Sequence, residues 1–224
     1  MICWICGEPI QQSLRFNQLF RAPERICWNC KMNLEAVEGG CPNCGKRGSS
    51  GWCDNCLYWQ KQGILVQNHS LYYYNAFAKT LIERVKYHGD LRLLHSFTPM
   101  IQKYYKRVFR KMGGQDFVVV PVPLSGRKYR QRGFNQALVV AQSFPFPIYN
   151  GIHKAHDFTQ SQRTRKERLT ARADFCLKQP VDLKGKKILI VDDIYTTGST
   201  VHQIARLLKA FEPQSIYSFT LFRS

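Results

Sequence analysis

The fold is decided by the stretch Ile188-Leu-Ile-Val-Asp-Asp-Ile-Tyr-Thr-Thr-Gly-Ser-Thr200. Its apolar start predicts a buried strand over Lys187–Asp192, with two acids at the exit of that strand. A turn rich in Thr, Gly and Ser then leads into a helix that we expect from Thr200 to Phe211. Backbone N–H groups at the start of a helix form an anion site, which the helix dipole strengthens. Gly198 lets the backbone approach an anion such as a phosphate closely.

The polar side chains of this stretch suit a sugar phosphate. The hydroxyl-bearing residues that add donors for a phosphate are Thr196, Thr197, Ser199 and Thr200. Two adjacent hydroxyls of a ribose can each donate a charge-assisted hydrogen bond to Asp192 and Asp193. The simpler alternative is a strand, an acidic turn and a Ser- or Thr-capped helix without a ligand. The ordered combination of strand, acid pair and hydroxyl-rich turn favours the ligand-binding interpretation.

Apolar strands alternate with helices around this stretch. Helical spacing covers Leu71–His88, Leu91–Met112 and about 135–143. Strands are expected at Phe117–Pro123, Ile148-Tyr149 and Ser215–Phe222. Residues 153–172 are expected to form a long loop. This alternation predicts an α/β domain with a doubly wound, mostly parallel sheet. Its ligand site should lie at the carboxyl ends of the strands.

The first 60 residues form a cysteine-rich module. Eight of the chain's nine cysteines lie there, as the Cys-x-x-Cys pairs Cys3/Cys6, Cys27/Cys30, Cys41/Cys44 and Cys53/Cys56. Two such pairs complete a tetrahedron around Zn²⁺, so eight thiolates would hold two structural zinc ions without an open position for catalysis. Redox-active or free thiols are the competing interpretations. Pairing in sequence order is the simplest arrangement, but the spacing leaves an interleaved one open.

Two further features concern single residues of this cysteine set. In the turns that follow Cys6 and Cys44, Gly7 and Gly45 are available to take a positive φ. Cys176, the ninth cysteine, is expected to be a small buried hydrophobic residue.

Charge divides the chain at the same point. Residues 1–60 carry six Lys or Arg and five Asp or Glu, which leaves 27 and ten of the chain's 33 and 15 for residues 61–224. We therefore expect a zinc-binding module over 1–60 and a basic domain over 61–224, which suits a polyanionic partner. The sequence has no apolar run long enough to predict a membrane span, and no signal peptide is visible. We therefore expect a cytoplasmic protein, which a partner could bring to the inner face of the membrane.

The stretch from Ile188 to Thr200 resembles the phosphoribosyl-pyrophosphate (PRPP) motif of type I phosphoribosyltransferases. The resemblance implies that Asp192 and Asp193 contact the ribose hydroxyls and that Thr196, Thr197, Gly198, Ser199 and Thr200 cradle the 5′-phosphate. A pyrophosphate loop would comprise Leu124, Ser125, Gly126, Arg127 and Lys128, and Mg²⁺ would accompany PRPP. The long loop occupies the position of a catalytic lid, for which the candidates are Arg163, Arg165, Lys166 and Arg168, with Gln162 as a polar contact.

The whole chain resembles the ComF family of competence proteins, of the ComFC type. The segments that carry this resemblance are the double zinc ribbon, Val85-Lys-Tyr-His-Gly-Asp90, Pro121-Val-Pro-Leu124, Arg132-Gly-Phe-Asn-Gln136, Thr159-Gln-Ser-Gln162 and the PRPP motif. It implies a role in natural transformation, with a helicase-like ATPase as partner while single-stranded DNA enters the cell.

Two functions are compatible with these features. The first is an enzyme that transfers phosphoribosyl from PRPP to an unidentified acceptor, with any hood over the site supplied by residues 61–116. The second is a single-stranded DNA-binding protein that retains a PRPP pocket. Its candidate DNA contacts are Lys103, Lys106, Arg107, Arg130, Arg132 and Arg168. Interleaved cations and rings suit single strands, although helical spacing favours core positions for Tyr105 and Phe109.

Overall fold

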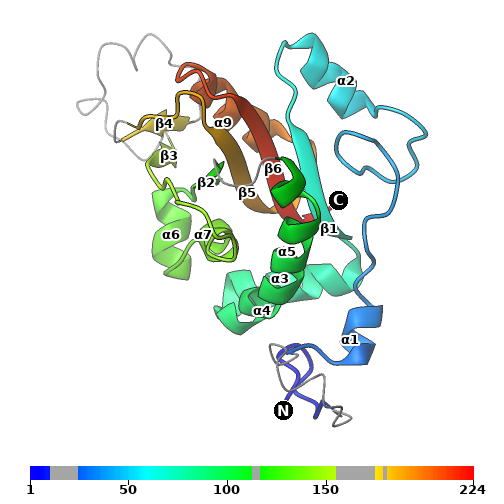
Figure 1. Ribbon diagram of the computed structural model, residues 1–224. Helices are drawn as coiled ribbons and strands as arrows, with labels where there is room; N and C mark the ends of the chain where they lie inside the picture. The colour runs from blue at the N-terminus through cyan, green and yellow to red at the C-terminus, as the bar shows by residue number, and fades with distance from the viewer. Residues whose placement is uncertain (11–24, 113–116, 155–174, 179–180) are drawn as a thin grey trace.

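The computed structural model describes residues 1–10, 25–112, 117–154, 175–178 and 181–224. At its centre lies a four-stranded sheet in the order β1-β6-β5-β2 (Figure 1), in which every pair of neighbours is parallel. The strands are β1 (Gln67–Tyr73), β2 (Phe117–Pro121), β5 (Lys187–Tyr195) and β6 (Ser215–Arg223). A parallel bridge from Val119 to Ile148 extends the sheet beyond β2. The predicted α/β class with a mostly parallel sheet is confirmed.

Helices cover both faces of this sheet (Figure 1). On one face lie α3 (Ala76–His88), α4 (Leu91–Ser96), α5 (Thr98–Arg107), the short 3₁₀ helix η2 (Phe109–Met112) and α7 (Gln136–Ala141), whose apolar residues share a core with Leu189 and Val191 of β5. On the other face α9 (Ser199–Lys209) packs on Ile188 and Ile190. The hairpin of β3 (Ile152–Lys154) and β4 (Phe175–Leu177) contributes to this second core. Alternate residues of β5 therefore serve opposite faces, as strand geometry requires.

The helical prediction for Leu71–His88 is wrong at its start, where β1 forms. Aromatic residues such as Tyr72 favour a strand, and the segment pairs with β6. The helix begins only after Asn75, whose side chain accepts a hydrogen bond from the Ala78 N–H. The predicted single helix over Leu91–Met112 is divided into α4, α5 and η2. The first break lies at Pro99, which lacks an N–H group and fits only the first turn of α5.

The described part of the first 60 residues packs against the domain that follows rather than standing apart from it. Their helices are α1 (Trp28–Met32) and α2 (Asp54–Lys61). The linker between the two pairs of Cys-x-x-Cys motifs pairs with the free edge of β1: Val37 N–H donates to the Leu71 carbonyl at 3.0 Å and Tyr73 N–H to the Glu35 carbonyl at 2.7 Å. This linker covers an edge that would otherwise be open to pairing with another chain.

None of the described helices is long and apolar enough to cross a lipid bilayer.

Candidate ligand site and cysteine clusters

By the strand order, the expected ligand crevice of the sheet lies between β2 and β5. From β5 the chain crosses through α9 to β6 on one side, whereas from β2 it continues to the Ile148 bridge on the other side. The connections thus diverge at this pair of strands, and ligands of open α/β sheets bind at such a point, beyond the carboxyl ends of the strands. The two segments that follow are residues 121–128 after β2 and residues 196–200 after β5. We call them the basic loop and the phosphate loop.

The phosphate loop is shaped around Gly198. This residue has a φ of 80° and lies at the N-terminal cap of α9, where it has no side chain of its own to cap the helix. The Thr197 hydroxyl oxygen accepts from the Ser199 N–H at 3.4 Å instead. A Cβ at Gly198 would lie 2.2 Å from the Tyr195 hydroxyl oxygen and 2.9 Å from His202 Cε1. Both side chains are buried. The residue must therefore be glycine for its conformation and for the packing beneath it, and not only for the approach of a ligand.

The two aspartates lie within β5, which runs to Tyr195, beyond the predicted end at Asp192. Since neighbouring residues of a strand alternate, Asp193 shares the face of Val191 while Asp192 shares that of Ile190. Asp193 is 5 % exposed, and its Oδ2 forms an ion pair at 2.6 Å with Nζ of Lys86, near the end of α3. Lys86 had no predicted role, although it belongs to a segment that carries the ComF resemblance.

The acid pair carries more negative charge than its surroundings accommodate. Burial raises the pKa of Asp192 well above its ordinary value, and the charge of Asp193 raises it further. Asp193 Oδ2 is buried, and within the described part of the chain its partner is the Lys86 ammonium rather than a well-directed hydrogen bond. A divalent cation that prefers oxygen ligands would offset the charge of Asp193 beside Asp192, so the residues fit Mg²⁺.

The basic loop leaves β2 at the same edge of the sheet. The ladder continues to Val122, whose N–H donates to the Val191 carbonyl at 2.9 Å. Ser125 caps α6 (Gly126–Arg132) by accepting from the Lys128 N–H at 3.4 Å. Leu124, Ser125 and Gly126 are half-buried, whereas Arg127 and Lys128 are exposed. The predicted neighbours of a pyrophosphate thus lie next to the strand that carries the aspartates.

The eight cysteines form two tetrads in sequence order. One comprises Cys3, Cys6, Cys27 and Cys30, and the other Cys41, Cys44, Cys53 and Cys56, with all sulfurs of a tetrad within 4.8 Å of one another. Individual Sγ–Sγ distances are 3.6–3.7 Å. A tetrahedral ion with Zn–S bonds of about 2.3 Å requires about 3.8 Å between sulfurs, whereas a disulfide requires about 2.05 Å. The simplest predicted pairing is confirmed, and each tetrad could hold zinc.

The local turns also match the prediction for metal-binding knuckles. Gly7 and Gly45 take positive φ values of 81° and 70°. Cys27 N–H donates to Cys3 Sγ and Cys53 N–H to Cys41 Sγ, both at 3.3 Å. Such N–H···S bonds stabilise thiolates around a metal. Cys176, by contrast, is half-buried in β4 rather than fully buried.

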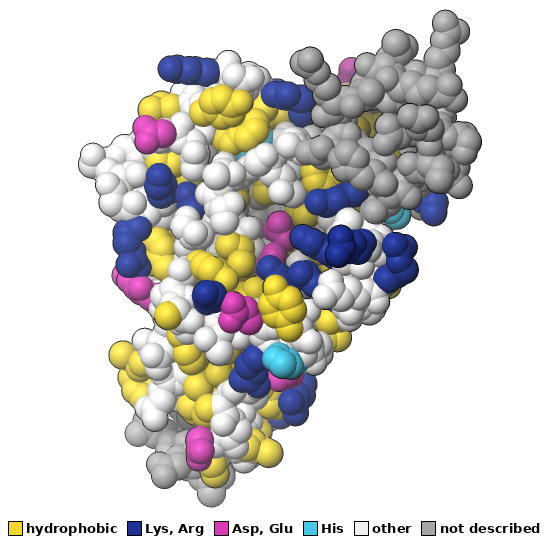
Figure 2. Space-filling view, turned by 180° about the vertical axis from the view of Figure 1, so that it is seen from behind, with side chains coloured by type: hydrophobic (Ala, Val, Ile, Leu, Met, Phe, Trp, Pro, Cys, Tyr) yellow, Lys and Arg dark blue, Asp and Glu magenta, His cyan; other side chains and the backbone are white. Residues whose placement is uncertain are grey.

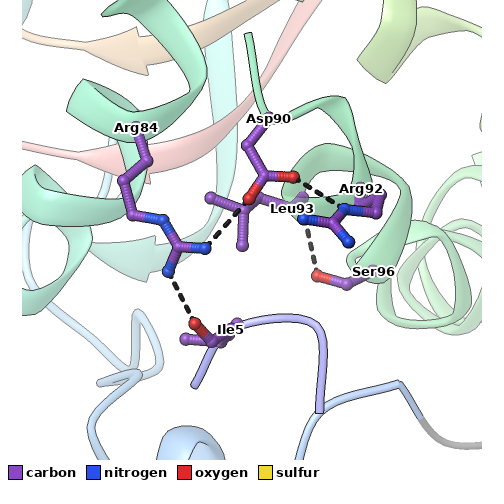
Figure 3. A network of polar contacts seen from close by, with 6 residues as sticks. All are labelled: Ile5, Arg84, Asp90, Arg92, Leu93 and Ser96. Carbon is purple, nitrogen blue, oxygen red and sulfur yellow. Dashed lines mark hydrogen bonds and ion pairs between the residues drawn. The ribbon is translucent and has the colours of Figure 1, made fainter. Parts of the chain in front are cut away.

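The first tetrad is joined to the helices that follow β1. Figure 3 shows Arg84 donating to the Ile5 carbonyl, at 2.6 Å, and to Asp90 Oδ2, at 2.9 Å. Arg92 donates to the other oxygen of Asp90 at 3.1 Å. Burial would raise the pKa of Asp90, but the two arginines outweigh it, so that this pKa lies below its ordinary value. These contacts fix the end of α3, from which Lys86 reaches Asp193.

The predicted DNA-contacting cations that the structure describes lie on two helices. Lys103, Lys106 and Arg107 of α5 are exposed, as is Arg130 of α6, whereas Arg132 is half-buried and donates to Gln136 at 3.2 Å. Figure 2 shows Lys and Arg side chains gathered beside a small acidic group near the middle of one face. The catalytic candidates Arg163, Arg165 and Lys166, with Gln162 and Arg168, lie outside the described residues.

The rings interleaved with the α5 cations face inward. The Tyr104 hydroxyl forms a hydrogen bond with His69 Nδ1 at 3.0 Å. Tyr105 packs edge-on against Phe146, and Phe109 is fully buried. The core position expected for Phe109 is confirmed, and Tyr105 is half-buried. Exposed rings instead lie beside other cations, at Tyr87 and Tyr129.

Comparison with known proteins identifies the family. Residues 94–224 match the family "Phosphoribosyl transferase domain". The whole chain is 33% identical to competence protein ComFC of Bacillus subtilis (strain 168), over 95% of that protein, and 31% identical to ComFC of Streptococcus pneumoniae (strain ATCC BAA-255 / R6), over all of it. The chain belongs to the ComFC family.

More distant relatives of this ComFC-family chain include "DNA utilization protein YhgH" of Escherichia coli (strain K12), 28% identical over 92% of the chain and 90% of that protein. Among solved structures, a hypoxanthine-guanine phosphoribosyltransferase from Bacillus anthracis covers 58% of the chain and 68% of its own length, with 16% identity and a TM-score of 0.38. The phosphoribosyltransferase fold therefore rests on the family match and on the topology, not on this structural likeness.

Proposed function

We propose that the crevice between β2 and β5 binds PRPP together with Mg²⁺, and that the two cysteine tetrads hold structural zinc ions. The single observation that carries the first part is the ion pair of Lys86 with the buried Asp193, at the edge of the sheet where the phosphate loop begins. A buried carboxylate that lacks a well-directed hydrogen bond among the described residues is suited to an incoming hydroxyl donor or cation.

Each part of the site then has a chemical task. The phosphate loop and the N-terminus of α9 receive the 5′-phosphate, while Asp192 and Asp193 accept hydrogen bonds from the ribose hydroxyls. The basic loop lies beside them and faces the pyrophosphate with Arg127 and Lys128. Mg²⁺ supplies positive charge to the pyrophosphate when it is bound. Lys86 neutralises Asp193 in the absence of the ligand.

Isothermal titration calorimetry with PRPP and Mg²⁺ tests this proposal. Binding of one PRPP per chain is expected for the wild type, with a large loss of affinity in Asp193→Asn. Asp182→Asn is the matched control, because Asp182 is exposed and, in the described part of the chain, accepts a hydrogen bond from the Lys184 N–H of its own turn. Absence of heat in the wild type, or equal affinity in the two variants, would reject the proposal.

We further propose that this protein serves DNA uptake in competence, in the cytoplasm, and binds single-stranded DNA. The names of its ComFC and YhgH relatives and the formal charge of +18 support this assignment. The exposed cations of α5 and α6 would follow the phosphates, with Tyr87 and Tyr129 as the rings available to bases. A helicase-like ATPase partner and the lid role of Arg163, Arg165 and Lys166 stay predictions, as does the division at residues 60 and 61.

Salt dependence tests the DNA-binding proposal. Each neutralised phosphate of a single strand contributes about −0.7 to the slope of log affinity against log salt, so replacing three cations should reduce the slope by about 2. The test variant is Lys103→Ala/Lys106→Ala/Arg107→Ala. The control with the same loss of charge is Lys61→Ala/Lys79→Ala/Lys184→Ala, whose three lysines are exposed on other elements. Equal slopes in both variants would exclude α5 from the DNA contact.

The alternative is an active phosphoribosyltransferase without a nucleic-acid role. The feature that favours it is the acid pair and phosphate loop at one strand end, which a DNA-binding scaffold does not need. Pyrophosphate release with nucleobases, amines and DNA as acceptors distinguishes the two functions. Release that depends on an acceptor supports the enzyme, whereas PRPP binding without release supports the accessory protein.

A further inference from the structure

Four consecutive carbonyl groups at the phosphate loop are each held by a buried or partly buried side chain. Arg223 Nη1 donates to the Tyr195 carbonyl at 3.1 Å and to the Thr196 carbonyl at 3.0 Å. Trp59 Nε1 donates to the Thr197 carbonyl at 2.9 Å. His202 Nδ1 bonds the Gly198 carbonyl at 2.7 Å. Because Val66 N–H donates to His202 Nε2, the ring proton lies on Nδ1, which is therefore the donor.

Fixing these carbonyls also fixes the amides of the loop. In a planar trans peptide the C=O of one residue and the N–H of the next point in opposite directions. Holding a carbonyl therefore also fixes the direction in which the N–H group of the following residue points. A run of N–H groups presented together is an anion-binding arrangement. The side chains that hold the carbonyls thus determine whether the loop can receive a phosphate.

Two of these side chains connect the loop to the second cysteine tetrad. Trp59 lies on α2, which begins directly after the ligand candidate Cys53, and its ring stacks on His202 with centroids 4.4 Å apart. Arg223 donates through Nε to the Cys44 carbonyl at 2.9 Å and through Nη2 to Cys44 Sγ at 3.3 Å. The guanidinium is buried, with 1 % of the residue exposed, so its geometry depends on these acceptors.

We propose that the second tetrad, Cys41/Cys44/Cys53/Cys56, positions the phosphate loop for PRPP through Trp59 and Arg223. A metal that gathers the four sulfurs fixes the Cys44 knuckle and the start of α2 together, and these are the two points from which the loop is held. The inference rests on the proposed function for the ligand, but the positioning of the loop is testable without PRPP. Trp59 and Arg223 are positioning residues, since neither needs to touch the ligand.

The first tetrad offers a comparison within the same molecule. Among the described residues, its hydrogen-bonded link to the core runs from Ile5 through Arg84 of α3 to Asp90, just before α4, and not to the phosphate loop. Loss of metal from the first tetrad should therefore affect α3, whereas loss from the second should affect residues 195–200.

Hydrogen exchange of the zinc-loaded full chain tests the positioning. Trp59→Phe keeps an aromatic ring against His202 but removes the N–H donor, and Trp52→Phe is the control, since Trp52 belongs to the same module and is 39 % exposed. Faster exchange of a peptide covering 195–201 is expected in Trp59→Phe and not in Trp52→Phe. Loss of one hydrogen bond to the loop should weaken PRPP by about five-fold. Equal exchange in the two variants would overturn the proposal whether or not PRPP binds.

Metal release tests the coupling in the reverse direction. If metal at the second tetrad supports PRPP binding, linkage requires PRPP to stabilise that metal by the same factor. In wild type, PRPP should therefore raise the chelator concentration needed to remove one of the two zinc ions at equilibrium, and this protection should decrease in Trp59→Phe. A purely structural role of Trp59 would lower Tm but leave the protection intact. Failure of PRPP to bind wild type would reject the proposed function, whereas binding without protection of either zinc would reject this inference.

Discussion

Gly198→Ala should distort the phosphate loop because two separate costs fall on one methyl group. At a φ of 80° an L side chain costs about 1–2 kcal/mol. The new Cβ would also lie 2.2 Å from the Tyr195 hydroxyl oxygen and 2.9 Å from His202 Cε1. Overpacking of this kind costs about 1–3 kcal/mol, which gives about 3 kcal/mol together.

Neither neighbour can move aside at low cost. Tyr195 is 2 % exposed with Arg223 over its ring, and His202 is fully buried, held by hydrogen bonds at both ring nitrogens. The backbone of the loop must therefore shift instead. A chain of this size loses about 2–4 °C of Tm per kcal/mol, so we expect a decrease of about 6–12 °C. If about 2 kcal/mol of this distortion energy must be recovered when PRPP binds, PRPP affinity falls about 30-fold.

Gly185→Ala is the matched control. Gly185 has a φ of 67° in a turn that contacts Glu212, and within the described residues a Cβ there meets no atom within 4 Å. This variant carries only the conformational cost, about 1–2 kcal/mol, and should leave PRPP binding unchanged. Thermal unfolding and calorimetry of both variants measure the difference. Equal losses of Tm, or wild-type PRPP affinity in Gly198→Ala, would refute the reasoning about Tyr195 and His202.

Three further predictions concern buried or partly buried charges. Lys86→Met leaves the buried Asp193 without its cation. We expect the free energy of unfolding to fall by about 2 kcal/mol, which lowers Tm by about 4–8 °C. The double variant Lys86→Met/Asp193→Asn should largely restore this stability, and no rescue would contradict the ion pair. Burial and the charge of Asp193 raise the pKa of Asp192, so ionisation of Asp192 destabilises the fold as pH rises. The Tm of Asp192→Asn relative to wild type should therefore increase from pH 5 to pH 8, while its PRPP affinity is lower. A Tm difference that shrinks as pH rises would contradict this. Arg84→Met should lower Tm by about 2–4 °C at pH 7 and by less at pH 3–4. The reason is that the pKa of Asp90 is lowered, so the stability that its ion pairs contribute disappears as pH falls through that pKa. A loss of Tm that does not depend on pH would count against the Arg84–Asp90 ion pair.

Much of the fold and the site could be predicted because local signals agreed with the tertiary structure. The apolar runs at β2, β5 and β6 and the four Cys-x-x-Cys pairs are short-range patterns, and the structure confirms the parallel sheet and the pairing of cysteines in sequence order. Strand β1 was missed because Leu71 and the following tyrosines fit helical spacing equally well, and its pairing with β6 joins segments about 150 residues apart.

The partners of the phosphate loop could not be predicted for the same reason. Trp59 and Arg223 lie 138 and 27 residues from the carbonyls of Thr197 and Thr196 that they hold, and neither residue type in isolation indicates a ligand site. Lys86 is a further case, since its contact with Asp193 depends on how α3 crosses the end of β5. A signal for Arg223 did exist, because an arginine that ends an apolar strand needs buried acceptors.

The crystal structure of this chain with PRPP and Mg²⁺ tests the central claim most directly. We predict density for the 5′-phosphate against the amides of residues 196–200, the ribose hydroxyls at the aspartate pair, and Lys86 displaced from Asp193. A crevice without ligand at saturating PRPP, or PRPP bound away from β2 and β5 with the Lys86–Asp193 contact intact, would contradict the account.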